Sequence, residues 1–151
     1  MNGFNRLSVF LVAMALLVTA TPAAWAREMV ASNVKTLNMR SGPGTRYAAD
    51  WTVTRGYPFQ VLKRKGNWLQ VRDFENDRAW VYRPMTDKQP HRVVKSDVLN
   101  LRRSPSTHAA VVMKAVYGDV LRTLVQRGKW TKVRHDSGKV GWVATRLTWG
   151  W

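Results

Sequence analysis

Hydrophobic and polar residues alternate along several short stretches of this chain. Residues 59–64 alternate in this way. In residues 68–72, Leu69 and Val71 alternate with Trp68, Gln70 and Arg72. The same order returns at residues 130–134. A period of two with β-branched and aromatic residues is typical of short β-strands that bury one face. No stretch beyond residue 26 shows a convincing helical period, so we expect an all-β protein.

Glycine, proline and asparagine separate the predicted strands. Lys65-Gly66-Asn67 and Arg127-Gly128-Lys129 each lie between two strand-like stretches, and glycine readily adopts the positive φ that a tight hairpin turn needs. Both are therefore predicted hairpin turns. The stretch from Arg83 to Lys95 contains Pro84 and Pro90 and is the expected connector between two structural units.

The chain contains an internal repeat with one constant offset, which aligns Trp68 with Trp130 and Trp80 with Trp142. At this offset, and without a gap, fourteen positions between 37 and 81 are identical to their counterparts in the later copy. The motif NMRSGPGT returns as NLRRSPST. Such self-similarity indicates a duplicated structural unit. A copy of about 60 residues has a small core and is marginally stable alone.

The N-terminus has the features of a secretory signal peptide. Arg6 precedes an apolar run from Leu7 to Ala20, and Ala24-Trp25-Ala26 is a small-x-small triplet that signal peptidase can cleave. The run is shorter than the roughly 20 apolar residues that span a bilayer. We therefore expect residues 1–26 to be removed, followed by a first domain at 27–86, a linker at 87–95 and a second domain at 96–151.

The composition restricts the available partners. The chain has no cysteine, so disulfides cannot stabilise it outside the cytoplasm. Beyond residue 26 there remain 24 Lys and Arg against 9 Asp and Glu, a net charge of +15. This charge attracts anionic partners at long range. For an exported chain, periplasmic or secreted, these are envelope polymers, anionic lipid and wall peptides, with nucleic acid a weaker alternative. We expect no transmembrane span in the mature chain.

The repeated motifs resemble those of bacterial SH3 domains, often called SH3b. The family pattern is LNVRSGPGT, a glycine before a hydrophobic strand, G-x-W-x-x-V and then G-W-V. The first copy matches it except that Ala79 stands where the last motif usually has glycine; the second keeps Gly141 but has Ser104 and Ser106 in place of the SGPG glycines. The resemblance implies two tandem SH3-like β-barrels, similar to small exported proteobacterial proteins. It also implies that SGPG shapes the long loop, called the RT loop, beside the usual peptide groove.

Residues for catalysis are scarce. The chain has no thiol, no HExxH and no G-x-S-x-G motif, and His91, His108 and His135 are scattered. Asp73, Glu75 and Asp77 fall in one expected hairpin loop, whereas a paired-carboxylate hydrolase needs acids on opposite walls of a cleft. We therefore predict no enzymatic activity, no cofactor and no metal site.

The aromatic residues divide into two groups. Trp68, Trp80, Trp130 and Trp142 recur in both copies and are expected in the structural core. Tyr47, Trp51 and Tyr82 are replaced in the second copy by Ala109, Met113 and Ala144. A residue needed for the barrel should be retained in both copies more readily than one needed for a ligand. The first copy is therefore the candidate binding domain.

The charges near the expected groove suggest what it binds. Arg40, Arg46 and Arg55 lie in a loop region with one acid, Asp50. A proline-rich peptide flanked by arginine would be repelled, whereas arginine binds carboxylates through paired hydrogen bonds. The predicted ligand-binding set is Arg40, Arg46, Tyr47, Trp51, Arg72 and Tyr82. For any single turn cation, such as Lys63 or Lys129, the simpler interpretation is a solvated surface residue.

The sequence thus favours a non-enzymatic, exported protein that binds cell-wall peptide, peptidoglycan or another envelope component. Two alternatives stay open. One is a protein–protein adaptor of the envelope; the other is a general polyanion binder that attaches to lipid head groups or nucleic acid.

Overall fold

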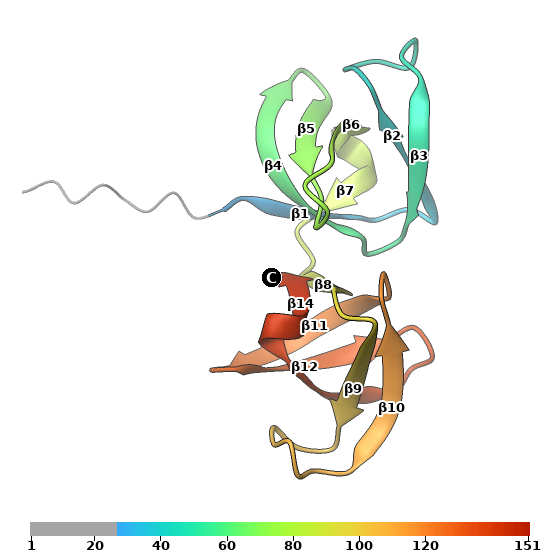
Figure 1. Ribbon diagram of the computed structural model, residues 1–151. Helices are drawn as coiled ribbons and strands as arrows, with labels where there is room; N and C mark the ends of the chain where they lie inside the picture. The colour runs from blue at the N-terminus through green and yellow to red at the C-terminus, as the bar shows by residue number, and fades with distance from the viewer. Residues whose placement is uncertain (1–26) are drawn as a thin grey trace, which may run out of the picture.

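The computed structural model describes residues 27–151, which form two small β-units joined end to end (Figure 1). The predicted signal peptide and its cleavage site lie outside the described residues. In the described part of the chain the regular elements are fourteen β-strands and two short 3-10 helices. The expected all-β class with two tandem SH3-like units is confirmed.

The first unit is one curled antiparallel sheet with the strand order β3-β2-β6-β5-β4-β1-β7. Its strands are β1 (Met29–Ser32), β2 (Thr36–Arg40), β3 (Ala49–Thr54), β4 (Pro58–Lys65), β5 (Trp68–Arg72), β6 (Arg78–Tyr82) and β7 (Thr86–Asp87), with the helix η1 (Arg83–Met85) before β7. The single bridge between Arg40 and Trp80 joins β2 to β6. The sheet therefore curls around its own hydrophobic face.

The second unit repeats this topology strand for strand. Its order is β10-β9-β13-β12-β11-β8-β14. The strands are β8 (His91–Val94), β9 (Val98–Arg102), β10 (Val111–Val116), β11 (Val120–Arg127), β12 (Trp130–His135), β13 (Val140–Ala144) and β14 (Thr148–Gly150), with η2 (Thr145–Leu147) before β14. β14 pairs with β8, so the C-terminal residues close the second unit, and the chain ends between the two units (Figure 1).

Each unit has its own core built from the alternating strand positions. The first core contains Leu37, Met39, Phe59, Leu69 and Val71 among its buried members. In the second core the equivalents of Leu37, Met39, Phe59 and Val71 are Leu99, Leu101, Leu121 and Val133. Burial of these apolar side chains is the main stabilising contribution, because neither unit has a disulfide.

The two predicted hairpin turns are present. Gly66 has φ 55° between β4 and β5, and Gly128 has φ 55° between β11 and β12. A residue with a Cβ is disfavoured at such a φ, which explains why glycine occupies this turn in both copies.

The connection between the units is short. β7 ends at Asp87 and β8 begins at His91, so residues 88–90 join the two sheets. His91–Val94, which falls in the expected linker, is instead a strand of the second sheet paired with β11 and β14. The units also touch directly, because the turn at Gly56 packs on the ring of His91: a Cβ on Gly56 would lie 2.7 Å from His91 Cδ2.

The four repeated tryptophans lie on the outer face of their strands. On β5 and β6 the core residues Leu69 and Val81 are cross-strand neighbours. The neighbouring pairs in this ladder, Trp68 with Tyr82 and Gln70 with Trp80, therefore lie on the opposite face of the sheet. Trp80 is nevertheless only 9% exposed, with Lys63 Nζ 5.6 Å from its ring centroid. Trp142 is buried in the same way under Arg127. Trp68 and Trp130 are half-buried.

Candidate binding groove

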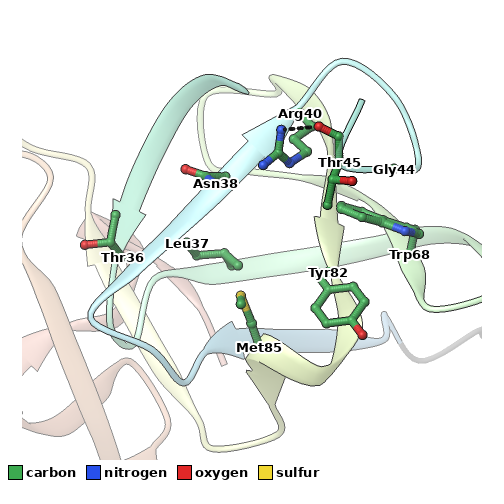
Figure 2. A pocket seen from close by; sticks show the side chains of 9 residues that line it. All are labelled: Thr36, Leu37, Asn38, Arg40, Gly44, Thr45, Trp68, Tyr82 and Met85. Atoms are coloured by element: carbon green, nitrogen blue, oxygen red, sulfur yellow. Dashed lines mark hydrogen bonds between the residues drawn. The ribbon is translucent and has the colours of Figure 1, made fainter. Parts of the chain in front are cut away.

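A groove of about 580 Å³ crosses the outer face of the first unit (Figure 2). Strand β2, the following loop, the start of β5, the end of β6 and η1 all contribute to it. Its lining consists of Thr36, Leu37, Asn38, Arg40, Gly44, Thr45, Trp68, Tyr82 and Met85. The volume lies within the range of small-ligand sites, and an apolar surface with a few polar groups is typical of them.

Trp68 and Tyr82 form the aromatic side of this groove. They are directly opposite in the β5–β6 ladder, and their ring centroids are 5.3 Å apart with a tilt of 54°. Figure 2 shows these rings on one side and Thr36 and Asn38 on the other. Because both rings are half-buried, each keeps a surface that a ligand can cover.

Arg40 positions the loop that borders the groove. Its Nη1 donates to the carbonyl oxygen of Tyr47 at 2.7 Å and to that of Thr45 at 3.3 Å. The second copy keeps the first of these bonds, from Arg102 Nη1 to the carbonyl oxygen of Ala109 at 2.9 Å. The arginine of the repeated NxR motif therefore shapes the loop in both copies, and in the first copy it is also a cation of the groove.

Tyr47 lies against the glycines of its own loop. Its ring covers Gly42 and contacts Gly44, and Arg46 stacks on it with Cζ 5.1 Å from the ring centroid. Arg46 Nη2 donates to the Tyr47 hydroxyl at 3.2 Å, and this bond together with the guanidinium charge lowers the pKa of Tyr47. Neither Tyr47 nor Arg46 lines the groove.

Two more residues of the predicted ligand-binding set lie elsewhere. Trp51 is 41% exposed on edge strand β3, opposite Met39 of β2. Arg72 lies at the far end of β5, where its Nη2 donates to Gln60 Oε1 at 2.5 Å. Of the six predicted ligand-binding residues, the groove brings together Arg40 and Tyr82.

Trp68 lines the groove, although its recurrence in both copies led us to expect it in the core. The alternation in β5 indicates the outer position, because it places Trp68 with Gln70 and Arg72 on the face opposite Leu69 and Val71. Repetition at the equivalent tryptophan of the second copy obscures this signal, because a large aromatic residue kept in both copies is more often part of a core.

Asn38 and Thr45 also line the groove without belonging to the predicted set. Both lie in the repeated motif, and recurrence in both copies points first to the shape of the loop. Only the tertiary structure shows that these two side chains line the same groove as Trp68 and Tyr82.

The second copy has a different surface at the corresponding place. Tyr82 is replaced there by Ala144, which pairs with Trp130 and leaves that ring without an aromatic neighbour across the strand. Thr36 is replaced by Val98 and Met85 by Leu147. The aromatic pair is therefore a feature of the first copy.

Asp73, Glu75 and Asp77 have carboxylate oxygens within 4.8 Å of one another, close enough to hold a cation. Asp73 is nevertheless already engaged in the turn: its Oδ1 accepts from the backbone N–H groups of Glu75 and Asp77, both at 2.9 Å, and Tyr57 donates to its Oδ2 at 3.4 Å. Burial raises the pKa of Asp73. The cluster is therefore explained by the role of Asp73 in holding the turn between β5 and β6.

Comparison with protein families matches residues 33–88 and 95–150 to the bacterial SH3 domain family. The chain belongs to the bacterial SH3 domain family. Each match covers one sheet, apart from its first strand. Within the part that the structure describes, no helix is both long and apolar enough to cross a membrane.

The individual relatives are longer than the segment they share with this chain, and the solved structures are distant in sequence. This bacterial SH3 chain is 26% identical over 120 residues to the Bacillus subtilis (strain 168) protein named "Putative N-acetylmuramoyl-L-alanine amidase YrvJ", a match covering 72% of this chain and 23% of that protein. Solved structures with similarity include NlpC1 from Trichomonas vaginalis, with a TM-score of 0.38, 10% identity and coverage of 90% of this chain and 50% of that one. An NlpC/P60 family protein from Bacillus cereus ATCC 10987 has a TM-score of 0.38, 12% identity and coverage of 82% and 56%. The chain therefore spans about a quarter of the curated relative and about half of the structural ones.

Proposed function

We propose that this protein is an exported, non-enzymatic binding protein whose first SH3 domain holds cell-wall peptide in the Trp68–Tyr82 groove. The observation that supports this most directly is the aromatic pair itself, which keeps two half-exposed rings beside Arg40. The Bacillus subtilis relative is named as an N-acetylmuramoyl-L-alanine amidase, and in this proposal the segment shared with it supplies attachment to the cell wall.

The groove suits an extended peptide with a carboxylate. Trp68, Tyr82 and Met85 offer apolar contact, while Asn38 and Thr45 can exchange hydrogen bonds with peptide amides. The guanidinium of Arg40 uses one nitrogen for the loop and has further N–H donors for a carboxylate. Stem peptides of peptidoglycan carry both amides and carboxylates.

The test is retention on purified peptidoglycan at two salt concentrations. In the proposed mode, binding persists at high salt and is lost in Tyr82→Ala, because apolar and short-range polar contacts are weakly screened. Trp51→Ala is the matched control: it removes an exposed aromatic ring outside the groove and should leave retention unchanged. Circular dichroism shows whether both variants remain folded.

Three results would contradict the proposal. Binding that disappears at about 0.3 M salt would favour attachment by charge alone, since contacts to polyanions are strongly salt-dependent. Loss of retention in Trp51→Ala with Tyr82→Ala unaffected would move the site to the β3 edge. Absence of retention at both salt concentrations would favour the adaptor alternative.

A further inference from the structure

A second cavity, of about 530 Å³, lies between the two domains and is surrounded by positive charge. The first domain contributes Lys35 from the β1–β2 connection and Arg55 from the β3–β4 turn. The second contributes two arginines from its sheet, Arg122 of β11 and Arg134 of β12. His91 of β8, His135 at the end of β12 and Asp136 just after it complete the polar lining on this side. Four permanent cations therefore face one carboxylate, that of Asp136.

Three of these residues form a row across adjacent strands. Arg122 of β11 is directly opposite His91 of β8 on one side and Arg134 of β12 on the other. Directly opposite residues in antiparallel strands share one face of the sheet, and like charges in such pairs are destabilising. The Arg122–Arg134 pair is thus a cost to the isolated protein.

The first domain provides an internal comparison for this row. Its equivalent positions are Met29, Gln60 and Arg72, paired in the same register. There the amide oxygen of Gln60 accepts a hydrogen bond from Arg72 Nη2 at 2.5 Å. The second domain has replaced this acceptor with a second guanidinium, so the arginine that has a hydrogen-bond acceptor across the strand in one copy lies opposite a like charge in the other.

The lysine and the three arginines of the cavity form no ion pair within residues 27–151. The ion pairs in that part of the chain join Arg64 and Lys88 to Glu28, and His135 to Asp119. None involves Lys35, Arg55, Arg122 or Arg134. A multivalent anion would therefore meet charges that the protein itself leaves uncompensated.

Contacts between the domains hold the two sides of the cavity together. Gly56, adjacent to Arg55, packs on the ring of His91. Outside the cavity lining, Phe74 of the first domain and Tyr117 of the second have ring centroids 5.3 Å apart, and the Tyr117 hydroxyl donates to Glu75. Preformed cationic groups lose less conformational freedom on binding an anion.

We infer that this interdomain cavity is a binding site for a soluble oligophosphate. Guanidinium groups bind phosphate oxygens through paired N–H donors, and three of them with one lysine match a ligand that carries several charges on adjacent groups. A ligand with a single carboxylate would carry too little negative charge to balance these four cations. A nucleotide is less suited, since the cavity is lined by no Trp, Tyr or Phe on which a base could stack.

The probe for this site is tripolyphosphate, measured by calorimetry and thermal unfolding with the protein comprising residues 27–151 at about 0.15 M salt. We expect tripolyphosphate to bind and to raise the melting temperature. Arg122→Gln recreates the arrangement of the first domain, so it should raise the melting temperature without ligand and weaken tripolyphosphate binding about tenfold or more. Arg55→Gln, on the other domain, should also weaken binding.

Lys114→Gln is the matched control, because it removes the same charge from an exposed position on β10 outside the cavity. A loss of affinity in this control equal to that in Arg122→Gln would overturn the site in favour of nonspecific attraction.

Equal affinity for citrate would overturn the phosphate assignment. Binding to phosphatidic acid vesicles that depends on Arg122, without binding to tripolyphosphate, would show a lipid surface instead. Tyr82→Ala should leave tripolyphosphate binding intact, which separates this site from the wall-binding groove.

Discussion

The ring of Tyr47 lies so close to Gly42 that any Cβ at position 42 would overlap it. The second copy changes both positions together: Ser104 replaces Gly42 and Ala109 replaces Tyr47. The two substitutions are therefore coupled, since the smaller side chain at 109 provides the room that serine at 104 needs. The SGPG motif in this protein reflects packing against a tyrosine as well as the shape of a loop.

This coupling predicts a specific double-mutant result. Gly42→Ala should lower the melting temperature, because the added methyl group displaces the Tyr47 ring. Tyr47→Ala combined with Gly42→Ala should recover much of that loss, giving a favourable interaction energy in the cycle. Additive effects of the two substitutions would contradict the coupling. Ser104→Ala in the second copy is the control and should be close to neutral.

The second domain can be used to test the aromatic groove by gain of function. Ala144→Tyr places a tyrosine directly opposite Trp130, as Tyr82 is opposite Trp68. If this pair is what binds wall peptide, the variant should be retained on peptidoglycan more strongly than the wild type, because two linked sites bind with avidity. Unchanged retention would indicate that other first-domain residues, such as Thr36 or Met85, are also needed.

The contact between Tyr117 and Glu75 should make the domain interface sensitive to alkaline pH. Its hydrogen bond to Glu75 raises the pKa of Tyr117 to about 12. A tyrosine pKa above its usual value near 10 means that folding favours the protonated form. This contribution to stability is complete below about pH 10 and is lost as the pH rises through about 12.

The measurement is the stability difference between the wild type and Tyr117→Phe from about pH 9 to pH 12. Phenylalanine keeps the tilted ring contact with Phe74 but removes the hydroxyl, so the wild type should be more stable at the lower pH and lose this advantage toward the higher one. A difference that stays constant over this range would show that the hydroxyl does not couple the domains.

Core and groove aromatics should differ in their effect on stability. Phe59 is fully buried in the first core, and Phe59→Ala should lower the free energy of unfolding by about 3–5 kcal/mol. Trp68 is half-buried on the outer face, so Trp68→Ala should cost less while affecting retention on peptidoglycan more. Denaturant unfolding measures the first quantity. A larger loss of stability for Trp68→Ala than for Phe59→Ala would assign Trp68 to the structure instead of the ligand.

Export is a prediction that rests on the sequence alone. Cleavage after Ala26 should give a mature protein that begins at Arg27, and N-terminal sequencing of the envelope-associated protein checks this. Recovery of the protein with Met1 intact would contradict a cleaved signal peptide.

The amino-acid sequence alone indicated the repeat, the strands at residues 59–64, 68–72 and 130–134, and the hairpin turns. Each depends on local chemistry or on direct self-comparison: a period of two along a strand, glycine at positive φ at Gly66 and Gly128, and one constant offset between the copies. The tertiary structure decided which of the aromatic and charged residues meet. Trp68 reaches Tyr82 only through the register of β5 on β6, and Arg122 faces Arg134 only through the pairing of β11 with β12. Cross-strand pairing and the packing of one domain on the other bring together residues that are separated in the chain. A local hydrophobic pattern shows which face of a strand is buried, but it does not show which strand lies beside it or in which register.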